Sequence, residues 1–335
     1  MLRIAVLGCG RIGRMHAANI AAHPRAALAG VYDVHAPAAA EVAAATGATN
    51  FASAEALMAD ASVDAILIAT STPTHADFIE MAAQFGKPVL CEKPIDLSID
   101  RVNTCAARIA GKGMPVMLGF VRRFDPGHRS VREAIASGQL GDLHQVVITS
   151  RDPGLAPDSY IEASGGIFRD MTIHDFDMAR YMLGEEIATV YATGARFVNS
   201  SLMERVDDQD TVTVLMTSVT GKQVTILNSR RAVYGYDQRV EAFGSAGMAI
   251  SENRTLHNAQ VYSASGTYRR PPLQDFFIER YTEAFAAEID AFVDAVENGT
   301  APEVGFDDGR LALVLAEAAL KSVKEGRVVA VSEVA

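Results

Sequence analysis

The first 120 residues alternate short apolar runs with longer stretches that are rich in alanine. The apolar runs are rich in β-branched residues and have no polar face, as is typical of parallel strands buried on both sides. The stretch at 75–85 is followed by Gly86 and Pro88, which commonly end a helix. This alternation predicts βαβ units and a doubly wound α/β domain. The predicted strands are 4–7, 28–32, 65–69, 89–91 and 116–118, and the clearest helices are 37–46 and 75–85.

Beyond residue 120 the pattern changes, because strand-like runs follow one another with one clear helix among them. Such a pattern favours an α+β domain built on a mostly antiparallel sheet. In the last helical stretch Leu311, Val314, Leu315 and Ala318 recur at helical spacing and are expected to face a core. We expect two domains, 1–120 and 121–335, with the C-terminal helices able to pack back near their junction. The predicted strands are 144–150, 190–195, 211–218, 223–228 and 238–242, and the helices are 127–136, 169–183, 276–296 and 308–324.

The composition is that of a soluble globular protein, with 335 residues, of which 49% are hydrophobic and 21% charged. A formal charge of −11 argues against nucleic acid as a partner, because phosphate binding relies on Lys and Arg. No apolar run approaches the roughly 20 residues of a membrane helix, and the N-terminal run is too short for an export signal. Cys9, Cys91 and Cys105 form neither an even disulfide framework nor a metal-binding spacing. We therefore expect a cytoplasmic protein that binds neither nucleic acid nor membrane.

A glycine-rich turn follows the first predicted strand, with Gly8, Gly10 and Gly13 in a GxGxxG pattern that opens a helix. Glycines in this position let the backbone approach a pyrophosphate at the helix N-terminus. Asp33 follows the second strand, where a carboxylate can accept hydrogen bonds from an adenosine ribose and repel a 2′-phosphate. The combination predicts NAD rather than NADP, and His35 is the one nearby residue that would soften this preference. Cys9 within the turn is either a small buried filler or a thiol activated by the helix N-terminus.

Two further segments follow strands at the carboxyl edge of the predicted sheet, where open α/β folds bind ligands. The first includes Thr70, Ser71, Pro73 and His75, which are candidates for lining the cofactor. An equally good interpretation is a helix start, with Thr74 as the cap and Pro73 setting the turn. The second is Cys91-Glu92-Lys93-Pro94, in which a lysine could stabilise an alkoxide or relay its proton, or could simply be solvated.

Asp170 and His174 are spaced four residues apart within the predicted helix 169–183, which would place them one turn apart on one face. A histidine supported by a carboxylate is suited to act as a general base in alcohol oxidation. A surface ion pair and a pair of zinc ligands are the alternatives. The metal interpretation is disfavoured because no third His or Cys completes a ligand set.

These motifs together resemble the Gfo/Idh/MocA oxidoreductases, and within them the bacterial inositol 2-dehydrogenases. The resemblance spans essentially the whole chain and rests on GCGRIG, STPTH, CEKP and SGGIFRDMTIHDFDMARYM, with support from GFVRRFD, SRDP and YGYD.

The resemblance implies a Rossmann domain, an α+β domain with an open sheet, and homotetramers assembled through those sheets. It implies a catalytic trio of Lys93, Asp170 as the supporting carboxylate and His174 as the proton acceptor. It also implies cofactor contacts from the turn, including Arg11 and Ile12, and from Glu92. Arg123, Asp152 and Tyr236 would line a polyol site with the trio.

The implied reaction is the NAD-dependent oxidation of myo-inositol to its 2-keto form, without a metal. Another inositol isomer, such as scyllo- or D-chiro-inositol, or a pyranose sugar is an alternative substrate. A regulator that binds NAD without catalysis is a further alternative, but it has no physical need for Lys93, Asp170 and His174 together.

Overall fold

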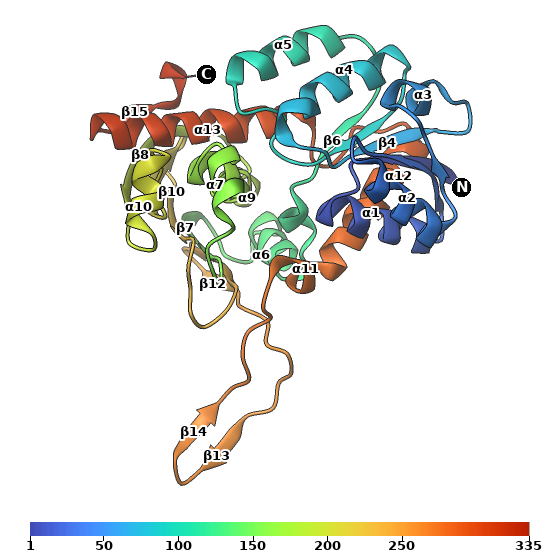
Figure 1. Cartoon of the computed structure of the whole chain (residues 1–335). Coiled ribbons are helices and arrows are strands. Elements are labelled where there is room, and N and C mark those ends of the chain that lie inside the picture. Colours follow the sequence, from blue (N-terminus) through green and yellow to red (C-terminus); the bar gives the residue numbers. More distant parts are fainter. Residues whose placement is uncertain (335) are drawn as a thin grey trace. The chain divides into compact units, whose positions relative to one another are not determined.

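The computed structural model describes residues 1–334, which form two compact units (Figure 1). Unit 1 comprises Met1–Val121 and Phe285–Leu313, and unit 2 comprises Arg122–Ala284 and the described residues from Val314 on. The chain therefore returns to the first unit after completing most of the second. The single boundary predicted after residue 120 does not describe this return. The returning segment contains buried apolar residues such as Ile289, Phe292 and Val293.

Unit 1 contains a six-stranded, wholly parallel sheet in the order β3-β2-β1-β4-β5-β6. Its central strand is apolar on both faces, with Ile4, Ala5, Val6 and Leu7 all fully buried. The strand order reverses between β1 and β4, which is where open α/β sheets bind ligands. The doubly wound α/β prediction is confirmed. The strands are β1 (Leu2–Leu7), β2 (Ala26–Tyr32), β3 (Thr49–Asn50), β4 (Ala65–Ile68), β5 (Val89–Cys91) and β6 (Val116–Leu118).

The helices of unit 1 include five in its N-terminal segment and parts of two that the chain supplies near its C-terminus. The expected helix stop at Gly86 is present, because α4 ends at Gln84 and Gly86 has a φ of 64°. The helices are α1 (Arg11–Ala22), α2 (Ala36–Thr46), α3 (Ala54–Ala59), the 3-10 turn η1 (Thr72–Thr74), α4 (His75–Gln84), α5 (Ile99–Ile109), most of α12 (Thr282–Asn298) and the start of α13 (Phe306–Glu325).

Unit 2 is built on a seven-stranded sheet in the order β12-β11-β7-β10-β9-β8-β15. Only β7 and β10 run parallel, so the expected mostly antiparallel sheet is confirmed. Along β9 the buried residues Val212, Val214 and Met216 alternate with exposed ones, so one face of the sheet is covered. The strands are β7 (Leu143–Arg151), β8 (Ile187–Ala195), β9 (Thr211–Ser218), β10 (Gln223–Ser229), β11 (Asp237–Gly244), β12 (Gly247–Ser251) and β15 (Val329–Ala330).

The remaining elements of unit 2 are the larger part of α13, short helices and a two-stranded hairpin at the tip of an extended arm (Figure 1). Nothing in the sequence pattern distinguished this arm from an ordinary loop. No helix within residues 1–334 has the length and apolar character needed to cross a bilayer. The elements are η2 (Val121–Phe124), α6 (Pro126–Ala136), α7 (Asp158–Ala163), α8 (Ile167–Asp170), α9 (Ile173–Leu183), α10 (Ser200–Arg205), β13 (Val261–Ser263), β14 (Gly266–Arg269), α11 (Phe277–Arg280) and η3 (Val331–Glu333).

The predicted helix 169–183 is wrong in one respect that concerns the site, because the helix is broken at Met171 and Thr172. The Thr172 amide donates to the Ile167 carbonyl, five residues back, and the His174 amide donates to the Met171 carbonyl, three residues back. These bonds interrupt the regular spacing of four residues. Asp170 therefore ends α8 and His174 belongs to α9, so the two residues do not share one continuous helical face.

Candidate functional site

The glycine-rich turn joins β1 to α1. At two of its three glycine positions no residue larger than glycine fits. A Cβ on Gly8, whose φ is 93°, would lie 2.4 Å from the Ala69 carbonyl oxygen, and one on Gly13 would lie 1.8 Å from the Gly8 oxygen. Gly10 differs, because a Cβ there would meet no atom of the described residues within 4 Å. Gly10 is also the N-cap of α1 and is exposed, so the first amides of that helix face open space where an anion can bind.

Asp33 lies directly after β2 and is held against this turn. One carboxylate oxygen accepts a hydrogen bond from the Cys9 amide at 2.6 Å, and the other accepts from the His35 amide at 2.7 Å. Each oxygen keeps a lone pair for a ribose hydroxyl. Burial, and then the Asp33 charge, raise the pKa of the Cys9 thiol to about 11. The activated-thiol alternative for Cys9 is therefore wrong, and Cys9 is the buried filler.

The turn after β4 presents hydroxyl groups at the same edge of the sheet. The Thr70 and Thr74 hydroxyls are 2.7 Å apart, and Thr74 donates to the Ser71 carbonyl at 2.8 Å. Thr74 does not cap α4 with its side chain, so that part of the helix-start interpretation is wrong. Pro73 does lie in the first turn of η1, and both Ser71 and Pro73 are exposed where a ligand can reach them.

His75 is buried and joins this turn to the next one along the sheet edge. Its Nδ1 atom is 2.8 Å from the Pro94 carbonyl oxygen, and its Nε2 atom is 3.0 Å from the Thr70 carbonyl oxygen. Both ring nitrogens are thus engaged by the protein itself. Its side chain is 1% exposed, which places it behind the ligand-facing surface rather than on it.

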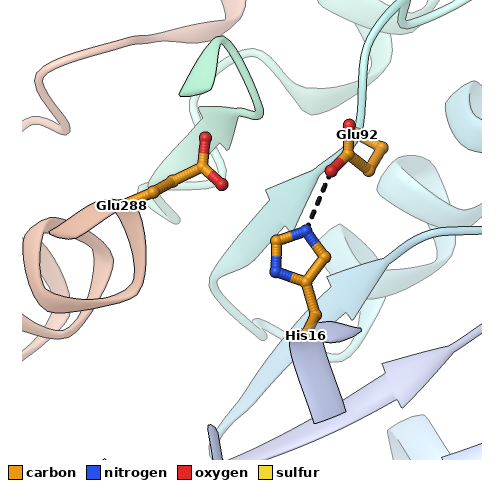
Figure 2. Close-up of side chains that lie close together, drawn as sticks. All are labelled: His16, Glu92 and Glu288. Atoms are coloured by element: carbon orange, nitrogen blue, oxygen red, sulfur yellow. Dashed lines mark hydrogen bonds and ion pairs between the residues drawn. The ribbon is translucent and has the colours of Figure 1, made fainter. Parts of the chain in front are cut away.

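Glu92 and Lys93 follow β5, and Glu92 belongs to a buried cluster with His16 of α1 and Glu288 of α12 (Figure 2). The His16 Nε2 atom is 2.9 Å from a Glu92 carboxylate oxygen. Burial raises the pKa of Glu92, but the hydrogen bond to His16 and the nearby charges of Lys93 and His75 outweigh it and lower that pKa. Burial and the Glu92 charge raise the pKa of Glu288 far above its ordinary value. These three donors lie close enough together to hold a metal ion, although the hydrogen bond to Glu92 already occupies the His16 Nε2 atom.

Asp170 of unit 2 is held by two side chains that the sequence did not point to. The Tyr160 hydroxyl donates to one carboxylate oxygen at 2.6 Å, and Arg230 donates to the other at 2.9 Å. His174 is half-buried and is the second residue of α9. Tyr160 and Arg230 lie 10 and 60 residues from Asp170 in the chain. No motif links such distant positions, so only the fold could reveal these partners.

Asp152 follows β7 in the same unit. Burial, and then the negative charge of Asp170, raise the pKa of the Asp152 carboxyl to about 6. The backbone at Asp152 is fixed on both sides, because its amide donates to Ser229 at 3.0 Å and its carbonyl accepts from Ala232 at 2.6 Å. Unit 2 therefore brings two acidic side chains, Asp152 and Asp170, under each other's electrostatic influence.

Arg123 and Tyr236 are both largely buried in unit 2. The Arg123 guanidinium forms a two-point contact with the Asp177 carboxylate, at 2.8 and 2.5 Å. The Tyr236 ring packs edge-on against Phe276 and Tyr281, with ring centres 6.2 Å apart in each case. These contacts fix both side chains in place.

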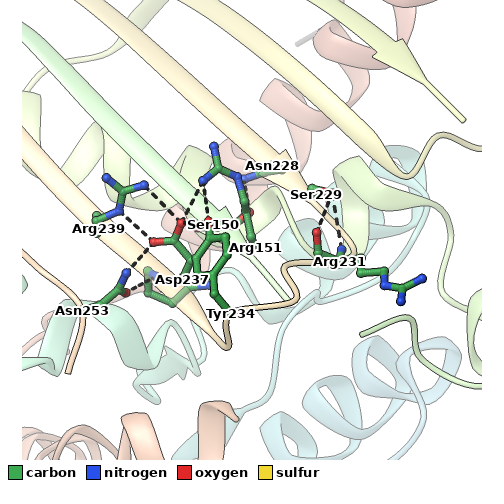
Figure 3. A network of polar contacts seen from close by, with 10 residues as sticks. Ser150, Arg151, Asn228, Ser229, Arg231, Tyr234, Asp237, Arg239 and Asn253 are labelled. Atoms are coloured by element: carbon green, nitrogen blue, oxygen red, sulfur yellow. Dashed lines mark hydrogen bonds and ion pairs between the residues drawn. The ribbon is translucent and has the colours of Figure 1, made fainter. Parts of the chain in front are cut away.

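A polar network pins the loop before Tyr236 to the end of β7 (Figure 3). Asp237 accepts hydrogen bonds from Tyr234 at 2.6 Å, Arg151 at 2.8 Å, Arg239 at 2.7 Å and Asn253 at 2.6 Å. Burial raises the pKa of Asp237, but its hydrogen-bond donors outweigh this and bring it to about 2. The network therefore fixes the positions next to both Asp152 and Tyr236.

The parallel sheet, the glycine turn and Asp33 define the class of protein, a dinucleotide-binding protein with a Rossmann fold. Residues 2–120 match the model of an oxidoreductase family with an NAD-binding Rossmann fold, and residues 128–250 match the GFO/IDH/MocA C-terminal domain. The chain belongs to the GFO/IDH/MocA family, as the sequence motifs predicted.

Relatives of the chain are known over its whole length. It is 46% identical to an inositol 2-dehydrogenase of Rhizobium meliloti (strain 1021), over 99% of each chain. The crystal structure of a myo-inositol dehydrogenase from Corynebacterium glutamicum superposes with a TM-score of 0.95 at 44% identity, covering 98% of each chain. A scyllo-inositol dehydrogenase from Lactobacillus casei with bound NAD(H) and scyllo-inositol gives a TM-score of 0.92 at 29% identity, covering 99% of each chain.

Proposed function

We propose that this protein oxidises myo-inositol to 2-keto-myo-inositol with NAD as the hydride acceptor. The observation that carries the proposal is the 46% identity to an inositol 2-dehydrogenase over 99% of both chains. The polar character of the candidate site supports it, because a ring of hydroxyls needs charged and hydrogen-bonding side chains rather than an apolar pocket. In this proposal residues 1–120 bind the cofactor, and residues 121–335 bind the substrate and form the oligomer.

The proposed cofactor site lies along the carboxyl edge of the parallel sheet. The turn containing Gly8, Gly10, Arg11, Ile12 and Gly13 would bind the pyrophosphate, and Asp33 would accept the ribose hydroxyls. Towards the nicotinamide the site would be completed by Thr70, Ser71, Pro73, Glu92 and Lys93, with His75 behind them. NAD, when bound, supplies the chemistry of hydride acceptance.

The proposed catalytic trio divides the proton and charge transfer among three side chains. His174 would take the hydroxyl proton, and the Asp170 carboxylate would stabilise the resulting imidazolium. The Lys93 ammonium would stabilise the charge on the oxygen while the carbinol carbon loses its hydride. Each turnover then converts the alcohol and NAD to the ketone, NADH and one proton.

The proposed substrate site includes Arg123, Asp152 and Tyr236 together with the trio. Asp152 would accept a hydrogen bond from a substrate hydroxyl through its carboxyl group. Arg123, which Asp177 fixes in place, would lie at the edge of this substrate site. Tyr236 would contribute its hydroxyl group to the site.

A second candidate substrate is scyllo-inositol, favoured by the likeness to the Lactobacillus casei enzyme crystallised with that isomer. The two isomers differ in the orientation of one hydroxyl group, so the same residues could bind either. Initial rates of NADH formation with myo-, scyllo- and D-chiro-inositol, glucose, galactose and xylose separate these candidates. We expect the highest kcat/KM on myo-inositol and a much lower value with NADP. NAD binding without turnover on any of these compounds would favour a non-catalytic regulator.

We further propose a cytoplasmic homotetramer. The uncovered face of the unit 2 sheet carries large apolar side chains that are 42–54% exposed, and such a surface on a monomer usually marks an interface. These side chains are Leu215 of β9, Phe243 of β11, and Met248 and Ile250 of β12.

A further inference from the structure

His75 presents both ring nitrogens to backbone carbonyl oxygens. Nδ1 lies 2.8 Å from the Pro94 oxygen, and Nε2 lies 3.0 Å from the Thr70 oxygen. A carbonyl oxygen can accept a hydrogen bond but cannot donate one. A neutral imidazole has one N–H group, so it would leave one nitrogen lone pair facing an oxygen lone pair. Only the doubly protonated ring satisfies both contacts.

The surroundings of His75 also bear on the protonation of its ring. The side chain is 1% exposed, so bulk water cannot separate the ring from either oxygen. The strand-end turns carry two charged groups, Glu92, which lies within electrostatic range of His75, and Lys93, which precedes Pro94. His75 begins α4, and a helix N-terminus disfavours a cation. Two carbonyl acceptors and the Glu92 carboxylate oppose that effect.

The position of His75 in the fold gives this charge a mechanical consequence. Thr70 belongs to the turn after β4, and Pro94 to the turn after β5. These turns carry Ser71 and Lys93, which the proposed function assigns to the cofactor and the substrate oxygen. A ring bonded to both turns fixes their separation, and the Pro94 carbonyl is one residue from Lys93.

We propose that His75 is held as an imidazolium that clamps the turn after β4 to the turn after β5 and so positions Lys93. The role given to Lys93 rests on the proposed function, whereas the charge of His75 does not. His75 is a positioning residue in this account and does not itself contact cofactor or substrate.

The same unit offers a histidine whose contacts require the opposite state. The Arg25 amide donates to the Nδ1 atom of His23 at 3.1 Å, so that nitrogen must be unprotonated, and Nε2 lies 2.8 Å from an Asp290 carboxylate oxygen. His23 is therefore predicted to be the neutral Nε2–H tautomer. It serves as an internal reference within one sample.

The test is nitrogen NMR of the full-length, histidine-labelled protein at neutral pH. The two nitrogens of an imidazolium have similar chemical shifts, whereas those of a neutral ring are widely separated. His75→Gln and His23→Gln assign the two signals by deletion. We expect the narrow pattern for His75 and the wide pattern for His23. A wide pattern for His75 overturns the clamp. A wild-type spectrum in which no histidine shows the narrow pattern also overturns it, and this outcome needs no assignment, so it stands even if the His75→Gln protein does not fold.

Kinetics test the positioning role separately. Gln keeps an N–H donor but carries no charge, so we expect His75→Gln to lower kcat by about 10- to 100-fold, as small misplacements of a catalytic group do. The KM for NAD should change by less than about threefold, and His23→Gln should match the wild type. An unchanged kcat in a folded His75→Gln protein would overturn the positioning role. If the wild type oxidised no inositol, the proposed function would fail while the NMR result still decided the charge of His75.

Discussion

At the scale of single residues, Asp170 is oriented by two donors from distant parts of unit 2. Tyr160 and Arg230 each bind one of its oxygens, so the carboxylate cannot rotate freely. A carboxylate held in this way can stabilise a cation on a neighbouring group without reorganising during the reaction. The proposal gives that task to Asp170, with His174 as the base it supports.

Replacement of His174 by alanine should therefore remove the base and spare the cofactor site. We expect kcat to fall by about 10²- to 10⁴-fold, the usual contribution of a general base. The affinity for NADH, measured by fluorescence titration, should stay within about twofold of the wild type. His257→Ala, which changes an exposed histidine, is the control. A kcat within tenfold of the wild type would remove His174 from its role.

The carboxyl of Asp152 should make stability depend on pH in a definite direction. Burial and the charge of Asp170 raise its pKa from 3.8 to about 6 in the folded chain. The folded state therefore holds this proton more tightly, and the resulting stabilisation is lost as the pH rises through about 6. Asp152→Asn has no such proton to lose. Its melting temperature, relative to the wild type, should thus increase between about pH 4 and pH 7. A constant difference across that range would contradict the assignment.

At the scale of elements, the hydrophobic pattern predicted most strands to within three residues, because β1 and its neighbours are apolar on both faces. The glycine turn and Asp33 were equally predictable, since dinucleotide binding requires these residue types at this spacing. The break at Met171 and Thr172 was not predictable, because both residue types are compatible with a continuous helix. The contacts of Tyr160 and Arg230 with Asp170 were not predictable either, because they join positions that are distant in the chain.

The glycines of the turn should differ in what they contribute. Gly13→Ala places a Cβ 1.8 Å from a backbone oxygen, so we expect a melting temperature lowered by several degrees and loss of NAD binding. Gly10→Ala meets no described atom within 4 Å, so it should fold normally and bind NAD more weakly by crowding the pyrophosphate. Thermal melts and calorimetric titration distinguish the two. Equal loss of stability in both variants would contradict this account of the turn.

At the scale of the whole molecule, the chain builds two units and returns to the first with residues 285–313. Sequence patterns located the C-terminal helices but could not assign them to a unit, because an amphipathic helix does not specify its partner surface. The uncovered apolar face of the unit 2 sheet is likewise visible only once strand register places Leu215, Phe243, Met248 and Ile250 on one side.

Charge on that face should disrupt the proposed tetramer. Leu215→Lys combined with Ile250→Lys would place two buried charges in a sheet-to-sheet interface, which is costly without partners. Light scattering should give about four chain masses for the wild type and a smaller assembly for the double variant. Phe85→Lys, an exposed apolar position in unit 1, is the control. A wild-type monomer, or a double variant of unchanged mass, would contradict assembly through this face.

The most direct test of the central claim is the fate of the hydrogen on carbon 2 of myo-inositol. The enzyme is supplied with NAD and myo-inositol deuterated at that carbon, and the reduced cofactor is analysed by mass spectrometry. Direct hydride transfer predicts one deuterium in every NADH formed, together with one equivalent of 2-keto-myo-inositol. Unlabelled NADH, or no NADH from any inositol, would contradict the account.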